Sequence, residues 1–200
     1  MITNIGQIDR SKVFSYADYL NWRFEEKIEL IKGKIFPMSP APSLRHQRVS
    51  MRLIGTMLSV FKTHSCDFFH APFDVRLTDS RRKKKWSDGE IYTVVQPDLC
   101  VVCDPSKLDE KGCLGAPDWI IEILSPGSLS YDLKKKYRLY EENKVKEYWL
   151  VNPMENYIQT FALQKDGHYG HYRILSDDED DFVSPVLFPE LNISLKEIFE

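Results

Sequence analysis

Short apolar runs, each bounded by proline, glycine or aspartate, dominate the pattern of hydrophobic and polar positions along the chain. Apolar runs of about four to eight residues that are bounded by such residues are typical of β-strands. Lys32-Gly33, between two such runs, is compatible with a hairpin turn. The predicted strands occupy residues 27–40 (a pair), 72–78, 96–105, 117–126, 146–153, 157–163 and 171–175.

Helical periodicity is strongest over residues 46–64, where apolar side chains recur close to the helical repeat. A second central helix is predicted over residues 130–144, and Ser128 or Ser130 is a candidate cap for its first turn. Shorter helices are predicted over residues 15–26 and 193–200, and residues 79–92 break the pattern as a polar loop.

The order of these elements predicts the fold class. A strand–helix–strand unit in the middle of the chain is flanked by further strands, which favours an α/β (α+β) fold with a curved mixed sheet flanked by helices. The 200 residues show no internal repeat and no low-complexity linker, and they suffice to bury a sizeable core. We therefore expect a single domain over residues 1–200.

Composition excludes several classes of protein. The net charge of −3 gives no global attraction to nucleic acid, so such binding needs a local basic patch. No apolar run approaches the length of about 18 residues that a membrane-spanning helix requires. The first residues lack the apolar segment of a signal peptide, so a soluble cytoplasmic protein is expected.

The four cysteines are interpreted as structural. Cys100 and Cys103 form a CxxC pattern, but they lie in a predicted strand, where residues three apart point to opposite faces. No second CxxC accompanies them, as a zinc site would require. Together with Cys66 and Cys113 they are expected to be buried free thiols.

Two acidic residues on predicted strands are candidates for chemistry. Glu122 interrupts an otherwise apolar strand, and a buried carboxylate needs a partner, a proton or a metal. Asp98 follows a proline at the start of the preceding strand, and if the two strands are neighbours both acids face one pocket. Paired carboxylates there suit a hard divalent cation. Alternatively, Asp98 merely begins a strand and Glu122 pairs with a lysine from a covering helix.

The helix over residues 130–144 supplies a candidate lysine. Lys134 and Lys135 fall on its polar face, whereas Lys136 shares an arc with Asp132 and Tyr140 and is predicted to point toward the sheet. Asp132 is correctly spaced for an ion pair with Lys136. The alternative is that the Lys136 ammonium extends outward to solvent.

These segments carry a resemblance to a known family. "QPDLCVV", "GAPDWIIEILSPGS" and "YDLKKKYRLYEENKVKEYWLVNP" are similar to the core of the Uma two family of putative restriction endonucleases, which belongs to the PD-(D/E)XK nuclease superfamily. "IELIKGKIFPMSPAPSLRHQRV" and "LFPELNISLKEIF" resemble its two ends, so the similarity covers nearly the whole chain. The motifs are specific in combination and weak singly.

The resemblance implies roles for individual residues. Asp98 and Glu122 match the two metal-binding acids, and the backbone carbonyl of Ile123 would be a further ligand for Mg²⁺ or Mn²⁺. The usual lysine, two residues after the second acid, is replaced by Leu124, and Lys136 is the position that matches the family's lysine. Glu29 and His46 also match family positions.

Several assignments remain open at the sequence level. Glu29 is either a third pocket acid or a surface residue, and His46 is either a hydrogen-bonding residue at a helix start or a ligand. Tyr140 either packs or donates a hydrogen bond to Lys136 or a phosphate. Asp118 is interpreted as a loop acid.

The function hypothesis is a Mg²⁺-dependent endonuclease that acts on DNA. Two alternatives use the same fold: a non-catalytic module that binds nucleic acid or a protein partner, and an interaction protein that forms a homodimer through an exposed strand such as residues 147–151. Divalent-metal binding at the acids separates the first hypothesis from the other two.

The basic run Arg81, Arg82, Lys83, Lys84 and Lys85 generates a prediction about DNA binding. We expect it to lie near the mouth of the pocket and to contact the phosphate backbone, unless it is only a solvated loop. Reversing its charges should weaken DNA binding and flatten the dependence of affinity on salt, measured by titration at several salt concentrations. An unchanged affinity and slope would leave the run as a solvated loop.

Overall fold

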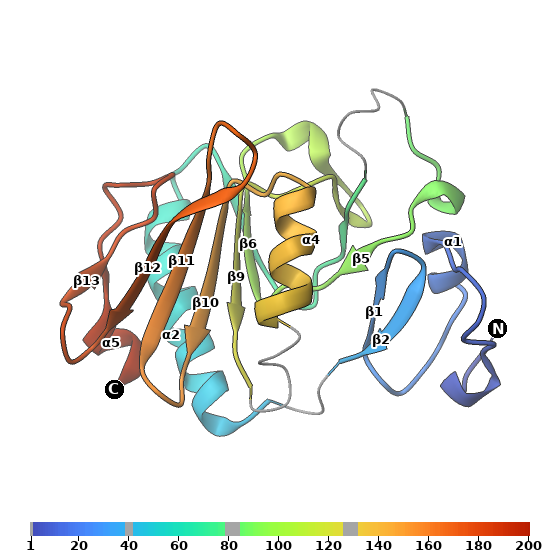
Figure 1. Ribbon diagram of the computed structural model, residues 1–200, viewed down its shortest axis with the longest axis horizontal. Helices are drawn as coiled ribbons and strands as arrows, with labels where there is room; N and C mark the ends of the chain where they lie inside the picture. Colours follow the sequence, from blue (N-terminus) through green and yellow to red (C-terminus); the bar gives the residue numbers. More distant parts are fainter. Residues whose placement is uncertain (1, 39–41, 79–84, 126–131) are drawn as a thin grey trace.

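The computed structural model describes residues 2–38, 42–78, 85–125 and 132–200, which form a mixed α/β fold (Figure 1). Two six-stranded sheets and a small two-stranded sheet account for its strands in these ranges. The single curved sheet expected from the sequence is therefore wrong. The additional sheet depends on Val75–Arg76, which lies inside the predicted strand 72–78, and on Val94–Val95, which spans too few residues for alternation to reveal it.

One of the six-stranded sheets, called the central sheet below, has longer strands than the other. It contains one parallel pair among antiparallel neighbours. Its parallel strands β9 and β10 are joined through η4 (Asp132–Lys136) and α4 (Tyr137–Glu142), which is the strand–helix–strand unit that the sequence predicts. Its strands, in spatial order, are β12 (Tyr169–Ser176), β11 (Tyr157–Leu163), β10 (Glu147–Asn152), β9 (Trp119–Ile123), β6 (Leu99–Val102) and β3 (Asp67–His70).

Helices cover both faces of the central sheet. The helices α2 (Leu44–Phe61) and α5 (Leu195–Phe199) lie behind it in Figure 1, and α4 (Tyr137–Glu142) lies in front. Alternation along β9 separates the two cores: Trp119 and Ile121 pack with the α2 and α5 side chains, whereas Ile120 packs with those of α4.

The second sheet, called the N-terminal sheet, begins with the expected hairpin. Lys32 and Gly33 both have positive φ, 49° and 75°, as a tight two-residue hairpin turn requires. Its strands, in spatial order, are β2 (Lys34–Pro37), β1 (Ile28–Ile31), β5 (Val94–Val95), β4 (Val75–Arg76), β8 (Gly112–Leu114) and β7 (Leu108–Asp109).

The chain crosses from one sheet to the other within three residues. Gln96, Pro97 and Asp98 connect β5 of the N-terminal sheet directly to β6 of the central sheet. This crossing brings the start of β6 close to the N-terminal sheet, and it determines where the candidate site lies.

The predicted helices are present with shifted bounds. The helix α1 (Tyr16–Tyr19) ends well before residue 26, and α2 begins at Leu44 because Ser43 caps its first turn. The second central helix consists of a π-helical segment, η4 (Asp132–Lys136), followed by α4. Ser128 and Ser130 lie outside the described residues. The remaining elements are η1 (Ile5–Gln7), η2 (Asp88–Glu90), η3 (Pro105–Lys107), β13 (Phe182–Val183) and β14 (Ile193–Ser194).

The expected role of residues 147–151 as an exposed dimerisation strand is wrong. They form part of β10, whose six residues are all buried between β11 and β9. Alternation of apolar and polar residues does not reveal the environment of this strand. Both of its faces are covered, so it is apolar on both sides.

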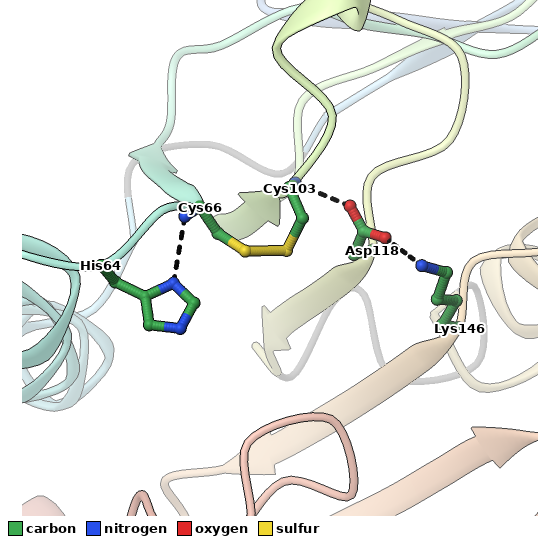
Figure 2. The surroundings of a disulfide bond; sticks show 5 residues. All are labelled: His64, Cys66, Cys103, Asp118 and Lys146. Atoms are coloured by element: carbon green, nitrogen blue, oxygen red, sulfur yellow. Dashed lines mark hydrogen bonds and ion pairs between the residues drawn. A yellow bond between two sulfur atoms is a disulfide. The ribbon is translucent and has the colours of Figure 1, made fainter.

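Two cysteines expected as free thiols form a disulfide. Cys66 and Cys103 flank the paired strands β3 and β6 and are bonded to each other (Figure 2), whereas Cys100 and Cys113 are free and buried. Cys100 and Cys103 contribute to different cores, as the alternation predicts. The pairing itself depends on the register of β3, a strand that the apolar pattern did not predict.

Asp118, interpreted from the sequence as a loop acid, is buried. Its Oδ2 accepts a hydrogen bond from the Cys103 backbone N–H at 2.7 Å, and its Oδ1 lies 2.6 Å from Lys146 Nζ (Figure 2). The carboxylate therefore fixes the start of β9 against the end of β6, which is a structural role.

Within the described ranges, no helix has the length and apolar character that crossing a membrane would require.

The disulfide generates a prediction about stability. It closes a loop of 37 residues, so its loss should lower the free energy of unfolding by about 3–4 kcal/mol. Denaturant titrations with and without a dithiol reductant measure this difference. Cys66→Ala is the control, because a variant without the bond should not respond to reductant. An equal response in both proteins would contradict the prediction.

Candidate functional site

Asp98 and Glu122 lie on neighbouring antiparallel strands. The register pairs Leu99 with Ile121 and Cys100 with Ile120, and its extension by one residue sets Asp98 opposite Glu122. Asp98 Oδ2 accepts a hydrogen bond from the Ile123 backbone N–H at 2.7 Å. The strand adjacency on which the sequence argument depended is therefore present.

A lysine ammonium joins two buried carboxylates at this point. Lys136 Nζ lies 2.9 Å from Glu122 Oε1 and 3.1 Å from Glu29 Oε1. Lys136 and Glu122 are each 4% exposed and Glu29 is 2% exposed, so all three are shielded from bulk water. Lys136 points toward the sheet, as predicted, and Glu29 is buried beside it rather than on the surface.

An ion pair between Glu122 and a helix lysine was expected from both interpretations of the sequence. What distinguishes this arrangement is that a second carboxylate, from the other sheet, meets the same ammonium. The Lys136 ammonium therefore joins an acid of the N-terminal sheet to an acid of the central sheet.

Tyr140 contributes a hydrogen bond to the same carboxylate. Its hydroxyl donates to Glu122 Oε1 at 2.7 Å, and the side chain is fully buried. Burial, followed by the charges of Glu122 and Glu29, raises the pKa of Tyr140 well above its ordinary value. The phenol therefore stays protonated and remains a donor. Neither packing alone nor the expected bond to Lys136 describes its role.

The helix presents the three lysines as its phase predicts. Lys134 and Lys135 are exposed, and the Lys135 ammonium lies 4.2 Å from the centre of the Phe36 ring. Lys136 ends the π-helical segment and Tyr140 lies four residues later in α4, so both side chains reach Glu122. The predicted Asp132–Lys136 ion pair involves a side chain outside the described residues.

His46 combines two expected features. Its backbone N–H donates to the Oγ of the capping residue Ser43, and its Nε2 lies 3.6 Å from Asp98 Oδ1. The ring is buried beside the acid. His46 is thus a helix-start residue whose side chain reaches the candidate site.

Leu124, two residues after Glu122, packs in the same apolar core as Leu139 and Tyr140. A lysine there would place its ammonium among apolar side chains. The cation instead comes from the helix, through Lys136.

The sequence analysis missed Gln96. Its backbone N–H donates to Glu29 Oε1 at 3.2 Å, and it is separated from Asp98 only by Pro97. The signal was its place before the Pro-Asp pair, but an uncharged amide gave no reason to single it out.

The oxygen donors at this point are those that could hold a cation of the magnesium type. Within the described residues, no three Asp, Glu, His or Cys side chains converge as a complete ligand set. Mg²⁺ ordinarily uses one or two carboxylates and keeps several waters. Asp98, whose side chain is 25% exposed, and Glu122 would supply such a pair, with the Ile123 carbonyl as the further ligand.

One neighbouring group is a poor candidate for chemistry. Burial raises the pKa of the Cys100 thiol well above its ordinary value, and the nearby Cys113 and Glu122 raise it further, so this thiol is not a nucleophile. Of the basic run, Arg81, Arg82, Lys83 and Lys84 lie outside the described residues, and Lys85 is exposed.

Comparison with known families matches residues 16–196 to Uma2, described as "Putative restriction endonuclease". The chain belongs to the Uma2 family. A curated relative is the uncharacterized protein slr1290 of Synechocystis sp. (strain PCC 6803), which is 27% identical over 158 residues and covers 78% of this chain and 77% of its own length.

A solved structure has the same fold. It is the crystal structure of a "putative nuclease belonging to DUF820" from Anabaena variabilis, with a TM-score of 0.68 and 22% sequence identity. The match covers 93% of this chain and 97% of the Anabaena chain. At this identity the likeness shows the fold of this chain and no residue role.

Proposed function

We propose that this Uma2 protein is a metal-dependent nuclease that hydrolyses phosphodiester bonds, with DNA as its substrate. The observation that carries the proposal is the buried Lys136 ammonium between Glu122 and Glu29, beside a partly exposed Asp98. Membership in a restriction-endonuclease family supports the same reaction class.

In this proposal Asp98, Glu122 and the Ile123 carbonyl hold Mg²⁺ or Mn²⁺. When bound, the cation would polarise a phosphoryl oxygen and lower the pKa of a coordinated water. The Ile123 N–H keeps the Asp98 carboxylate oriented through its 2.7 Å hydrogen bond, and the buried His46 ring restricts the same carboxylate from the other side.

Lys136 would stabilise the negative charge that develops on the phosphate during hydrolysis. Its ammonium is held by two carboxylates, so its position is set before substrate binds and little reorganisation is needed. Tyr140 keeps Glu122 turned toward Lys136, and Glu29 holds the ammonium from the N-terminal sheet. The run Arg81–Lys85 would contact the DNA backbone.

Asp98 provides the first test of the proposal. Calorimetric titration with Mn²⁺ should show binding by the wild-type protein, and Asp98→Ala should weaken it at least about a hundredfold, since losing an outer-shell partner alone costs roughly 10–100-fold. Asp98→Asn is the matched control for structure, because its amide oxygen still accepts from Ile123 N–H but carries no charge. It should fold like wild type, bind Mn²⁺ weakly and fail to cleave plasmid DNA. Equal Mn²⁺ affinity in all three proteins would refute the metal site.

The three consecutive lysines provide the second test. Lys136→Met should lower turnover of plasmid DNA by about a hundredfold or more and destabilise the protein by about 3 kcal/mol, because two buried ion pairs are broken. Mn²⁺ affinity should not fall, because an ammonium is not a metal ligand.

Lys134→Met and Lys135→Met are the matched controls, since both side chains are exposed. Their stability should stay within about 0.5 kcal/mol of wild type and their turnover close to it. Thermal melts establish that each variant is folded at the assay temperature. If all three variants cleave equally well, Lys136 is not the catalytic cation.

A further inference from the structure

A second polar cluster lies beside the candidate site, centred on Asp74. Asp74 Oδ2 accepts a hydrogen bond from the Tyr16 hydroxyl at 2.9 Å. Asp74 Oδ1 accepts hydrogen bonds from the Gln96 side-chain amide at 2.8 Å and from the Tyr19 hydroxyl at 3.5 Å. None of these residues has been given a role above except Gln96, through its backbone.

The donors in this cluster have fixed orientations. Burial, and next the Asp74 charge, raises the pKa of Tyr16 and of Tyr19 far above ordinary values, so both phenols remain protonated donors. A carboxylate can only accept, so the Gln96 amide must present its NH₂ group to Asp74. The same NH₂ lies 3.3 Å from the Tyr19 hydroxyl.

Gln96 connects this cluster to the candidate site through its own backbone. Its side chain is held by Asp74, while its backbone N–H donates to Glu29 Oε1, the same oxygen that lies 3.1 Å from Lys136 Nζ. Two residues later the chain reaches Asp98. The hydrogen bond from the Gln96 side chain to Asp74 restricts the orientation of the Gln96 backbone. The Gln96 N–H therefore has a set direction, and the Glu29 carboxylate lies where it can accept from it.

We propose that Gln96 is a positioning residue: Asp74 and the α1 tyrosines Tyr16 and Tyr19 clamp its side chain, so that its backbone N–H holds Glu29 against Lys136. The catalytic part of this inference rests on the proposed function, in which Lys136, the partner of Glu29, is the catalytic cation. The geometric part concerns hydrogen bonds of the metal-free protein and stands independently of cleavage.

The first measurement is amide hydrogen exchange by NMR, on metal-free protein. In Gln96→Ala residue 96 keeps its backbone N–H but loses the side-chain hydrogen bond to Asp74. Exchange of the residue-96 amide should accelerate by about tenfold as its bond to Glu29 weakens. Unchanged exchange at residue 96 would overturn the proposal.

A reciprocal exchange provides the second arm. Gln96→Glu alone sets two carboxylates against each other and should behave like Gln96→Ala. Combining it with Asp74→Asn restores the hydrogen bond in the reverse direction, because the new amide NH₂ at position 74 donates to the new carboxylate at position 96. The amide oxygen at position 74 can still accept from the Tyr16 hydroxyl. The double variant should recover slow exchange at residue 96, and a failure to recover would count against the clamp.

Kinetics separate positioning from a merely structural role. Gln96→Ala should lower kcat by about tenfold or more and leave KM and Mn²⁺ affinity close to wild type, because Glu29 is neither a proposed metal ligand nor a DNA contact. Asp177→Ala is the control: it removes the carboxylate that accepts from the Asn156 amide at 2.8 Å, a similar contact outside the site. A fall in kcat of the same size in Asp177→Ala would overturn the positioning role.

The two proposals fail differently. If the wild-type protein binds no Mn²⁺ and cleaves no DNA, the proposed function is wrong, and exchange at residue 96 still decides whether Gln96 positions Glu29. If wild type binds and cleaves but Gln96→Ala does so with unchanged kcat, the proposed function survives and the positioning role is wrong.

Discussion

The buried ammonium of Lys136 is the interaction on which the rest of the site depends. It meets Glu29 from the N-terminal sheet and Glu122 from the central sheet, so one charge connects three separate elements. Its removal would break the ion pairs of two carboxylates that are almost wholly buried, and breaking a buried ion pair costs several kcal/mol. The junction of the two sheets is therefore an electrostatic contact as well as a packing contact, and Asp98 lies at its exposed margin.

The parts of this site that follow local periodicity could be predicted from the sequence. Glu122 stood out as a single acid in an otherwise apolar strand, and the register of β6 and β9 brings Asp98 opposite it. Helical phase distinguished Lys136 from Lys134 and Lys135, because a buried and an exposed face alternate within a single turn. The π-helical segment before α4 did not disturb this argument, since Lys136 and Tyr140 are separated by a regular helical turn.

The parts that depend on contacts distant in sequence could not be predicted from it. For Glu29 the sequence left open a third pocket acid or a surface strand residue, because only the pairing of β1 with β5 brings it beside Gln96, and Gln96 itself carries no charge that would mark it. The Cys66–Cys103 bond depends on the register of β3, a strand that the sequence does not signal. Asp118 looked like a loop acid because its partners, Cys103 N–H and Lys146, come from other parts of the chain.

Anomalous X-ray diffraction from crystals soaked in Mn²⁺ tests the central claim most directly. The account predicts one strong anomalous peak bound by the carboxylates of Asp98 and Glu122, with Lys136 beside it and still within reach of Glu29. A saturating soak that gives no peak at these carboxylates, or that gives a peak only at other acidic side chains, would contradict it.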